Sequence, residues 1–169
     1  MAALGLAVGV SAAAAEPPTM FTPNDFQSFL LPWPDAPAPL CAVLVSPADW
    51  EKRFHPAPTI PGTRPFAPPD SFWRDHALVL IARRLPGGEA SGIFTDPAVT
   101  RTAGTLRLAI TFHPPQPSSW TMNGFVAVAV AKPVPQDVQI FENGDRICGG
   151  KQAVLFFKKE VLACLRLPE

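Results

Sequence analysis

The stretch that decides the fold begins with Ser46-Pro47-Ala48-Asp49-Trp50-Glu51-Lys52-Arg53-Phe54 and continues, after a Pro-rich loop, with Pro69-Asp70-Ser71-Phe72-Trp73. The apolar run Ala77-Leu78-Val79-Leu80-Ile81-Ala82 follows, and Arg83-Arg84-Leu85-Pro86-Gly87-Gly88 closes the stretch. A nearly continuous apolar run of this kind is typical of a strand that is covered on both faces. The stretch therefore predicts a short helix, an aromatic segment, a buried strand and a glycine turn.

The short helix is predicted to begin after Ser46. The Ser46 hydroxyl can accept a hydrogen bond from the third helical amide, and Pro47 suits the first helical position. Asp49 lies in the first turn, where the helix dipole favours an acid. Because Trp50 and Phe54 are four residues apart, they share one face, and we expect them to anchor the helix to the core.

The rest of the chain is dominated by β-type patterns. Strands are predicted over residues 40–45, 77–84, 91–95, 99–102, 105–112, 124–131, 138–142 and 145–148. Asp96-Pro97 is expected to separate the third strand from the fourth, and Asn143-Gly144 is a strong signal for a two-residue hairpin. Residues 153–167 fit one helix or two strands, and a β ending is favoured.

These elements predict one mainly-β domain of the α+β class with a single short helix. Residues 40–169 are expected to form a compact antiparallel, barrel-like sheet. Prolines exclude long helices and central strands from residues 16–39, which we expect to run extended over the surface. The apolar residues expected to tuck into the domain from this segment are Phe26, Phe29, Leu30, Leu31 and Trp33.

Composition limits the class of partner. The chain has 169 residues, of which 47% are hydrophobic, enough for one domain with a core of its own. Lys and Arg number 14, and so do Asp and Glu. Because there is no basic excess, we expect no nucleic-acid partner.

The first 15 residues resemble an export signal. They form an apolar run that ends in Ala13-x-Ala15 before Glu16, a pattern typical of a secretory cleavage site. The expected location is therefore the periplasm or the cell exterior of a bacterium. A positively charged start is missing, so a retained apolar segment is the alternative. No membrane span is expected unless that segment is retained.

The three cysteines are Cys41, Cys148 and Cys164, and they form no CxxC or Cys/His cluster of metal-binding spacing. In an exported protein they predict one disulfide and one remaining thiol. All three pairings are open, and buried unpaired cysteines are the alternative.

No catalytic residue is predicted. A nucleophilic hydrolase needs a Ser or Cys beside a His that an acid orients. The histidines are His55, His76 and His113, and no G-x-S-x-G elbow is present. Ser118 and Ser119 near His113 form only a weak pair.

No metal ligand or cofactor site is predicted either. Asp70, Asp75 and His76 come closest to a metal-binding set, but neighbouring residues of a strand point to opposite faces. Asn143-Gly144-Asp145 resembles part of a calcium loop that lacks its other ligands, so a turn is the better interpretation. No Gly-rich phosphate-binding pattern accompanies Gly87-Gly88.

This organisation resembles the family of small exported bacterial domains related to the C-terminal domain of the protease-complex subunit PrcB. The resemblance rests on Ser46-x-x-x-Trp50, on Asp70-Ser71-Phe72, on the strand that runs into Gly87-Gly88, and on the strand that Lys132-Pro133 closes. It covers residues 40–142. Family members usually place an aromatic residue after the glycine pair, where this chain has Glu89. The resemblance implies a compact mainly-β domain with one short helix and no established activity.

The candidate binding residues are Arg83, Arg84, Gly87, Gly88 and Trp120. The arginine pair is a candidate rim for an anionic or peptide partner, or simply a solvated strand end. The two glycines are expected to supply positive φ in a hairpin or bulge. Trp120 is either an interface anchor or a plug at one end of the sheet.

We expect an exported, non-enzymatic binding or accessory domain that contacts another protein, whose identity the sequence does not give. One alternative is a small hydrolase or protease-inhibitor-like domain that uses the loops near His76, Gly87-Gly88 and His113. The other is a structural subunit of a membrane-associated assembly that retains residues 1–15.

Overall fold

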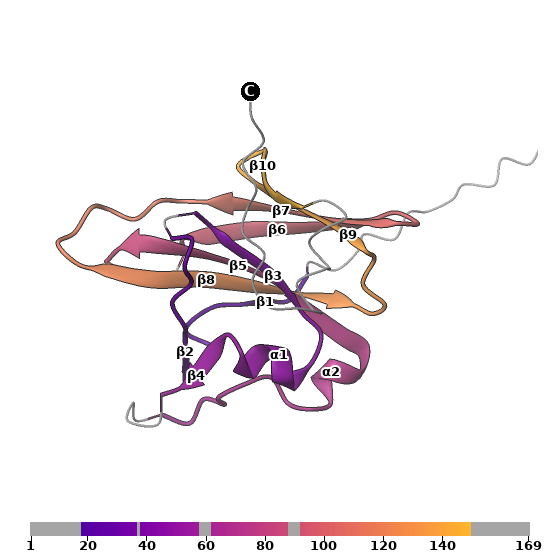
Figure 1. Ribbon diagram of the computed structural model, residues 1–169, viewed down its shortest axis with the longest axis horizontal. Helices are drawn as coiled ribbons and strands as arrows, with labels where there is room; N and C mark the ends of the chain where they lie inside the picture. Colours follow the sequence, from indigo (N-terminus) through magenta and orange to yellow (C-terminus); the bar gives the residue numbers. More distant parts are fainter. Residues whose placement is uncertain (1–17, 37, 58–61, 88–91, 150–169) are drawn as a thin grey trace, which may run out of the picture.

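The computed structural model describes residues 18–36, 38–57, 62–87 and 92–149, which form three layers (Figure 1). A four-stranded sheet lies in the middle, with a second sheet on one face. Two short helices and a two-stranded ribbon lie on the other face. The predicted mainly-β, α+β fold is confirmed. No helix in the described part of the chain is long and apolar enough to cross a membrane.

The middle sheet is antiparallel throughout, in the order β1-β8-β5-β3. Its strands are β1 (Met20–Phe21), β3 (Leu40–Leu44), β5 (His76–Pro86) and β8 (Thr121–Ala131). β5 and β8 pair without a register shift, from His76 opposite Ala131 to Pro86 opposite Thr121. Both strands are longer than their apolar runs predict, because pairing continues past the apolar residues.

The outer sheet has the order β10-β9-β7-β6. Its strands are β6 (Phe94–Arg101), β7 (Thr105–Phe112), β9 (Asp137–Glu142) and β10 (Asp145–Gly149). β7 and β9 are parallel, which differs from the expected antiparallel arrangement. After β7 the chain crosses to the middle sheet as β8 and then returns as β9, so two crossings restore the original direction. The predicted strands thus divide between two stacked sheets.

The third layer consists of α1 (Pro47–Glu51), α2 (Phe72–Asp75) and the antiparallel ribbon of β2 (Ser28–Leu30) with β4 (Phe54–Pro56). α1 is the predicted helix. α2 is a second helix, where only an aromatic segment was expected. It has four residues, about one turn, which is too short for a helical apolar pattern to mark it.

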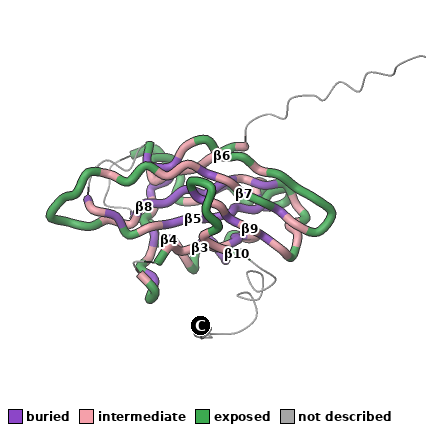
Figure 2. Tube along the Cα trace, turned by 90° about the horizontal axis from the view of Figure 1, so that it is seen from above, coloured by how far each residue is buried: buried purple, intermediate pink, exposed green. Residues whose placement is uncertain are grey.

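β5 is apolar from Ala77 to Ala82 because this part of the strand lies between two cores. Val79 and Ile81 point into the core between the sheets, and Leu78 and Leu80 point into the core beneath the third layer. Buried residues follow the paired strands, and exposed residues follow the connecting loops (Figure 2). The predicted burial of this strand on both faces is confirmed, and it accounts for the absence of polar alternation.

The start of α1 is confirmed at atomic detail. Ser46 Oγ accepts a hydrogen bond from Asp49 N at 3.3 Å and donates one to Asp49 Oδ2 at 2.8 Å. Trp50 and Phe54 are buried with their rings stacked 3.8 Å apart, so Trp50 anchors the helix to the core as expected. The expectation that the two residues share one helical face is wrong, because α1 ends at Glu51 and Phe54 belongs to β4. Phe54 also meets Phe125 of β8, with ring centroids 4.9 Å apart.

The Pro-rich segment docks as predicted at three of its five apolar residues. Phe26, Leu30 and Trp33 are buried. Leu31 is half-buried, and Phe29 is 50% exposed, so the prediction for Phe29 is wrong. The reason is strand alternation, which the extended-wrap prediction did not include. Phe29 belongs to β2 between two residues whose side chains take the other face.

The predicted break at Asp96-Pro97 is also wrong. β6 continues through these residues, and its register against β7 shifts between Thr95 and Ala98. Asp96 has a φ of 53°. This is a β-bulge, which leaves extra residues unpaired while the strand goes on.

The predicted hairpin at Asn143-Gly144 is confirmed. The two residues have φ values of 52° and 92°, as a tight turn between twisted strands requires. The Asn143 side chain also accepts from Phe112 N at 2.8 Å and donates to Phe112 O at 3.0 Å, which ties the turn to β7. Residues 153–167, 1–15 and Gly88 lie outside the described residues.

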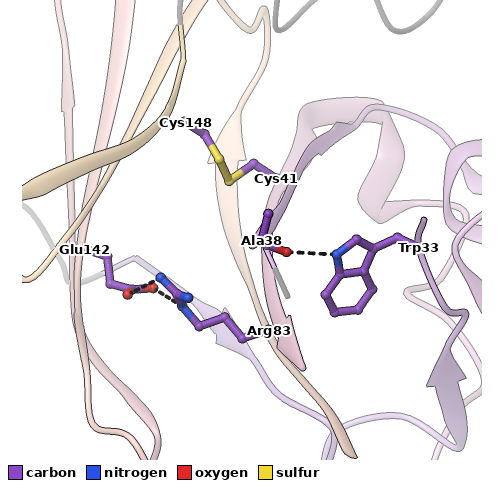
Figure 3. The surroundings of a disulfide bond; sticks show 6 residues. All are labelled: Trp33, Ala38, Cys41, Arg83, Glu142 and Cys148. Atoms are coloured by element: carbon purple, nitrogen blue, oxygen red, sulfur yellow. Dashed lines mark hydrogen bonds and ion pairs between the residues drawn. A yellow bond between two sulfur atoms is a disulfide. The ribbon is translucent and has the colours of Figure 1, made fainter. Parts of the chain in front are cut away.

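A disulfide joins Cys41 of β3 to Cys148 of β10, and thus the middle sheet to the outer sheet (Figure 3). Of the three pairings that the sequence left open, the structure contains this one. Cys164 lies outside the described residues. The bond links two edge strands on the same side of the stacked sheets.

Opening this disulfide is expected to lower the free energy of unfolding by about 2–5 kcal/mol, because a long cross-link restricts the unfolded chain. The sequence separation is 107 residues. Urea titrations with and without dithiothreitol measure the effect. The double variant Cys41→Ser/Cys148→Ser should match the reduced protein and respond to no reductant. An unchanged unfolding midpoint after verified reduction would contradict the expectation.

Candidate functional site

Arg83 and Arg84 lie on opposite faces of β5, because successive strand residues alternate. Arg83 is in phase with Ile81, which faces the core between the sheets. Arg84 is in phase with Ala82, which faces the third layer. Arg83 and Arg84, although adjacent in the sequence, therefore face two different layers of the fold.

Arg83 is engaged inside the fold. Its Nε donates to Glu142 Oε2 at 2.9 Å and its Nη2 donates to Glu142 Oε1 at 2.6 Å, a two-pronged ion pair between the sheets (Figure 3). Its guanidinium carbon also lies 5.0 Å from the centre of the Phe112 ring. The Glu142 side chain is only 7% exposed. Arg83 therefore ties β5 to β9, and Arg84 is the arginine available to a partner.

Arg83→Met is expected to destabilise the fold by about 3–5 kcal/mol, because it leaves the buried Glu142 carboxylate without its counter-charge. Chemical denaturation measures the loss. The double variant Arg83→Met/Glu142→Leu removes both charges and should recover most of it. A single variant as stable as the native protein would show that the ion pair contributes nothing here.

Arg84 borders a shallow groove between the Pro-rich segment and the end of the β5–β8 ladder. The groove has a volume of about 220 Å³, and its other lining residues include Pro32, Trp33, Ala36, Met122 and Asn123. Trp33 forms one wall of this groove, and its indole Nε1 donates a hydrogen bond of 2.9 Å to Ala38 O (Figure 3). Arg84 is exposed, and no hydrogen bond or ion pair joins its guanidinium to any described residue.

Gly87 and Trp120 extend the β5–β8 ladder by one pair. Gly87 N donates to Trp120 O at 2.5 Å. The Trp120 ring packs so closely over Gly87 that a Cβ atom at this position would overlap the indole. Gly87 has no positive φ, so the predicted conformational role is wrong. Glycine is needed here to leave space for an aromatic ring.

Trp120 is partly packed and partly exposed. One part of the indole covers Gly87, while the residue remains 55% exposed. Ser118 Oγ donates to Trp120 O at 3.0 Å and helps to hold the backbone of this loop residue. Of the described residues, only Phe29, Phe66 and Trp120 are large, apolar and exposed. Trp120 is the one that belongs to the predicted site.

Trp120 and Arg84 lie at the same end of the ladder but on opposite faces. Gly87 is in phase with Leu85, which belongs to the core between the sheets, so the indole above Gly87 lies on that face. Arg84 faces the third layer. The start of β8 separates the two side chains. We call Trp120, Gly87, Arg84, the groove and the start of β8 the Trp120 surface.

The hydrolase alternative gains no support from the described residues. His113 Nε2 lies 3.1 Å from Thr95 Oγ1, whereas Ser118 bonds the backbone of Trp120. His55 contacts the Phe29 ring, and His76 stacks on Phe72. The three histidines are therefore dispersed and exposed. Among the described residues, no three His, Cys, Asp or Glu side chains come close enough to hold a metal ion.

A second groove, of about 380 Å³, lies at the opposite end of the sheets between the β6–β7 turn and the segment after β8. Its one charged lining residue is Arg101. Arg101 already donates to the carbonyl oxygens of Pro133 and Ala131. This groove thus presents no unengaged charge.

The chain matches no protein-family model. Nor does it match any of the curated proteins or solved structures with which it was compared. The resemblance to the PrcB-related family therefore stays a prediction.

Sequence reasoning missed the groove residues Pro32, Trp33 and Asn123. No local pattern connects residues 32 and 33 with Arg84, because the crossing of the Pro-rich segment over the sheet brings them together. Strand alternation, however, is a signal that could have separated Arg84 from Arg83, which the sequence interpretation treated as one pair. It also places Asn123 directly opposite Arg84 once β5 and β8 are paired.

Proposed function

We propose that this protein is an exported, non-enzymatic binding domain that contacts another protein through the Trp120 surface. The observation that carries the proposal is Trp120, an aromatic side chain held against Gly87 and still 55% exposed. Trp and Arg are the residues that most often dominate binding energy at protein interfaces. A ring already held in place loses little conformational freedom on binding.

The size of the groove supports a protein partner over a small molecule. Its volume of about 220 Å³ is below the range of roughly 300–1,000 Å³ that is usual for small-molecule sites. A groove of this size suits one side chain of a partner. The unengaged guanidinium of Arg84 at its rim favours an acidic or other carboxylate-bearing residue.

Export is supported by two independent features. One is the Ala13-x-Ala15 pattern before Glu16. The other is the Cys41–Cys148 disulfide, a bond that persists in oxidising compartments. Mass spectrometry of the mature chain tests this part, with a start at Glu16 as the expected result. An intact residue 1 in the mature protein would contradict export by cleavage.

The contact is tested by photo-crosslinking in the native cell envelope, with benzoylphenylalanine in place of Ser119. We expect one dominant adduct, and Trp120→Ala should weaken affinity for the purified partner at least about 30-fold, as for an interface hot spot. Gly87→Ala should weaken binding as well, because its methyl group displaces the indole. Phe66→Ala removes another exposed aromatic ring and is the matched control.

Two outcomes would contradict the proposal. One is crosslinking from position 119 no stronger than from position 66. The other is equal affinity of the Trp120→Ala and Phe66→Ala variants for the recovered protein. Unfolding curves of all variants show whether a loss of binding comes from a loss of fold.

A further inference from the structure

The edge of β8 is only partly covered. β1 pairs with β8 at two positions, Val128 and Ala127, and Ala129 N donates to Thr19 O just beyond them. In the described part of the chain, no strand lies beside residues 121–126 of β8 on the side away from β5. The beginning of β8 thus presents an open strand edge at the Trp120 surface.

The direction of the backbone groups follows from the ladder. Trp120 O accepts from Gly87 N, so the backbone groups of residue 120 face β5. Ala129 N faces the opposite way, toward Thr19. Because these directions alternate along an antiparallel strand without a bulge, the N–H and C=O groups of Thr121 and Asn123 face the open edge.

The accessible part of this edge is short. Thr121 is exposed and Asn123 is half-buried, whereas Phe125 is only 2% exposed. The side chain of Asn123 donates to Leu30 O at 3.3 Å, and no described residue bonds the backbone groups of Asn123 on this edge. Thr121 and Asn123 together offer two donors and two acceptors, a complete set for one short added strand.

A strand added here would contact both candidate residues at once. Its side chains would alternate between the two faces of the middle sheet, as in any strand. One side chain would lie on the face of Trp120 and the next on the face of Arg84. An apolar residue suits the first position, and a carboxylate suits the second, where the guanidinium has no counter-ion among the described residues.

We infer that the partner binds by adding an extended segment to the edge of β8 at Thr121 and Asn123. An apolar side chain of this segment packs on Trp120, and the neighbouring Asp or Glu side chain pairs with Arg84. This inference rests on the proposed function and specifies the partner as an extended, apolar–acidic segment. It also explains why two binding side chains lie on opposite faces of one strand end.

The test uses the full chain and the probe peptide acetyl-Thr-Val-Glu-Val-Thr-amide, with binding followed by NMR. We expect saturable shifts at the Thr121 and Asn123 amides and slower hydrogen exchange at Asn123. A peptide with N-methyl groups at its Val and Glu residues should not bind, because in either strand direction this removes N–H groups that face β8. Arg84→Glu should weaken binding about tenfold and should favour the probe in which Lys replaces Glu.

Arg74→Glu is the matched control for the charge change. Arg74 is an exposed arginine of α2, at the opposite end of β5. This variant should bind the Glu probe like the native protein. Equal effects of Arg84→Glu and Arg74→Glu, binding of the N-methylated probe, or no saturable binding at millimolar concentration would each overturn the inference.

The outcomes separate this inference from the proposed function. A Trp120-dependent crosslinked partner that binds without protecting the Asn123 amide overturns strand addition and leaves the Trp120 surface as the contact. A homodimer that Thr121→Pro converts to a monomer would show that a second copy of this chain occupies the edge, and this too overturns the inference. Loss of the Trp120 dependence overturns the proposed function itself.

Discussion

The ladder between β5 and β8 is the constraint on which the rest of the structure depends. It runs without a bulge and separates two cores, one against the outer sheet and one against the helices and aromatic rings. Each residue in the middle of these strands must therefore suit one of two apolar environments. The bulky side chains Val126 and Val128 face the outer sheet, and Ala127 faces the aromatic layer, where small residues leave space for the large rings. At the end of the ladder the same alternation places the candidate binding residues Arg84 and Trp120 on opposite faces.

The two long sides of the stacked sheets are closed in different ways. On the side of β3 and β10, a disulfide joins the sheets covalently. Farther inside, the two-pronged ion pair of Arg83 with Glu142 joins them again. On the side of β8, the two-residue strand β1 covers only part of the edge. Open strand edges favour aggregation, and proteins usually block them. In the described part of the chain, an uncovered edge segment beside an exposed Trp is therefore better explained as a binding edge than as an edge left unprotected.

Much of the fold follows from the sequence, and the exceptions have physical causes. The cap at Ser46, the burial of the Ala77–Ala82 run and the turn at Asn143-Gly144 are encoded locally, so local patterns were sufficient. The parallel β7–β9 pair, the bulge at Asp96 and the Cys41–Cys148 bond are decided by how distant segments meet. The division of the strands into two sheets is also decided by how distant segments meet. A single barrel-like sheet and two stacked sheets would bury the same alternating residues.

The candidate site was predictable in some of its residues but not in its geometry. Arg84, Gly87 and Trp120 were identified from their types and positions, yet the reason for Gly87 was wrong, since the glycine leaves space for an indole that lies 33 positions later in the chain. The structure also couples this site to the fold. Among the described residues, the Gly87–Trp120 hydrogen bond is the last one of the central ladder, so a partner strand on β8 would extend the same hydrogen-bonded sheet that organises both cores. Any partner that binds only the folded ladder stabilises it by mass action, and a frayed ladder end weakens binding for the same reason. Under the proposed function, the affinity of the Trp120 surface for its partner and the order of the β5–β8 end would therefore change together.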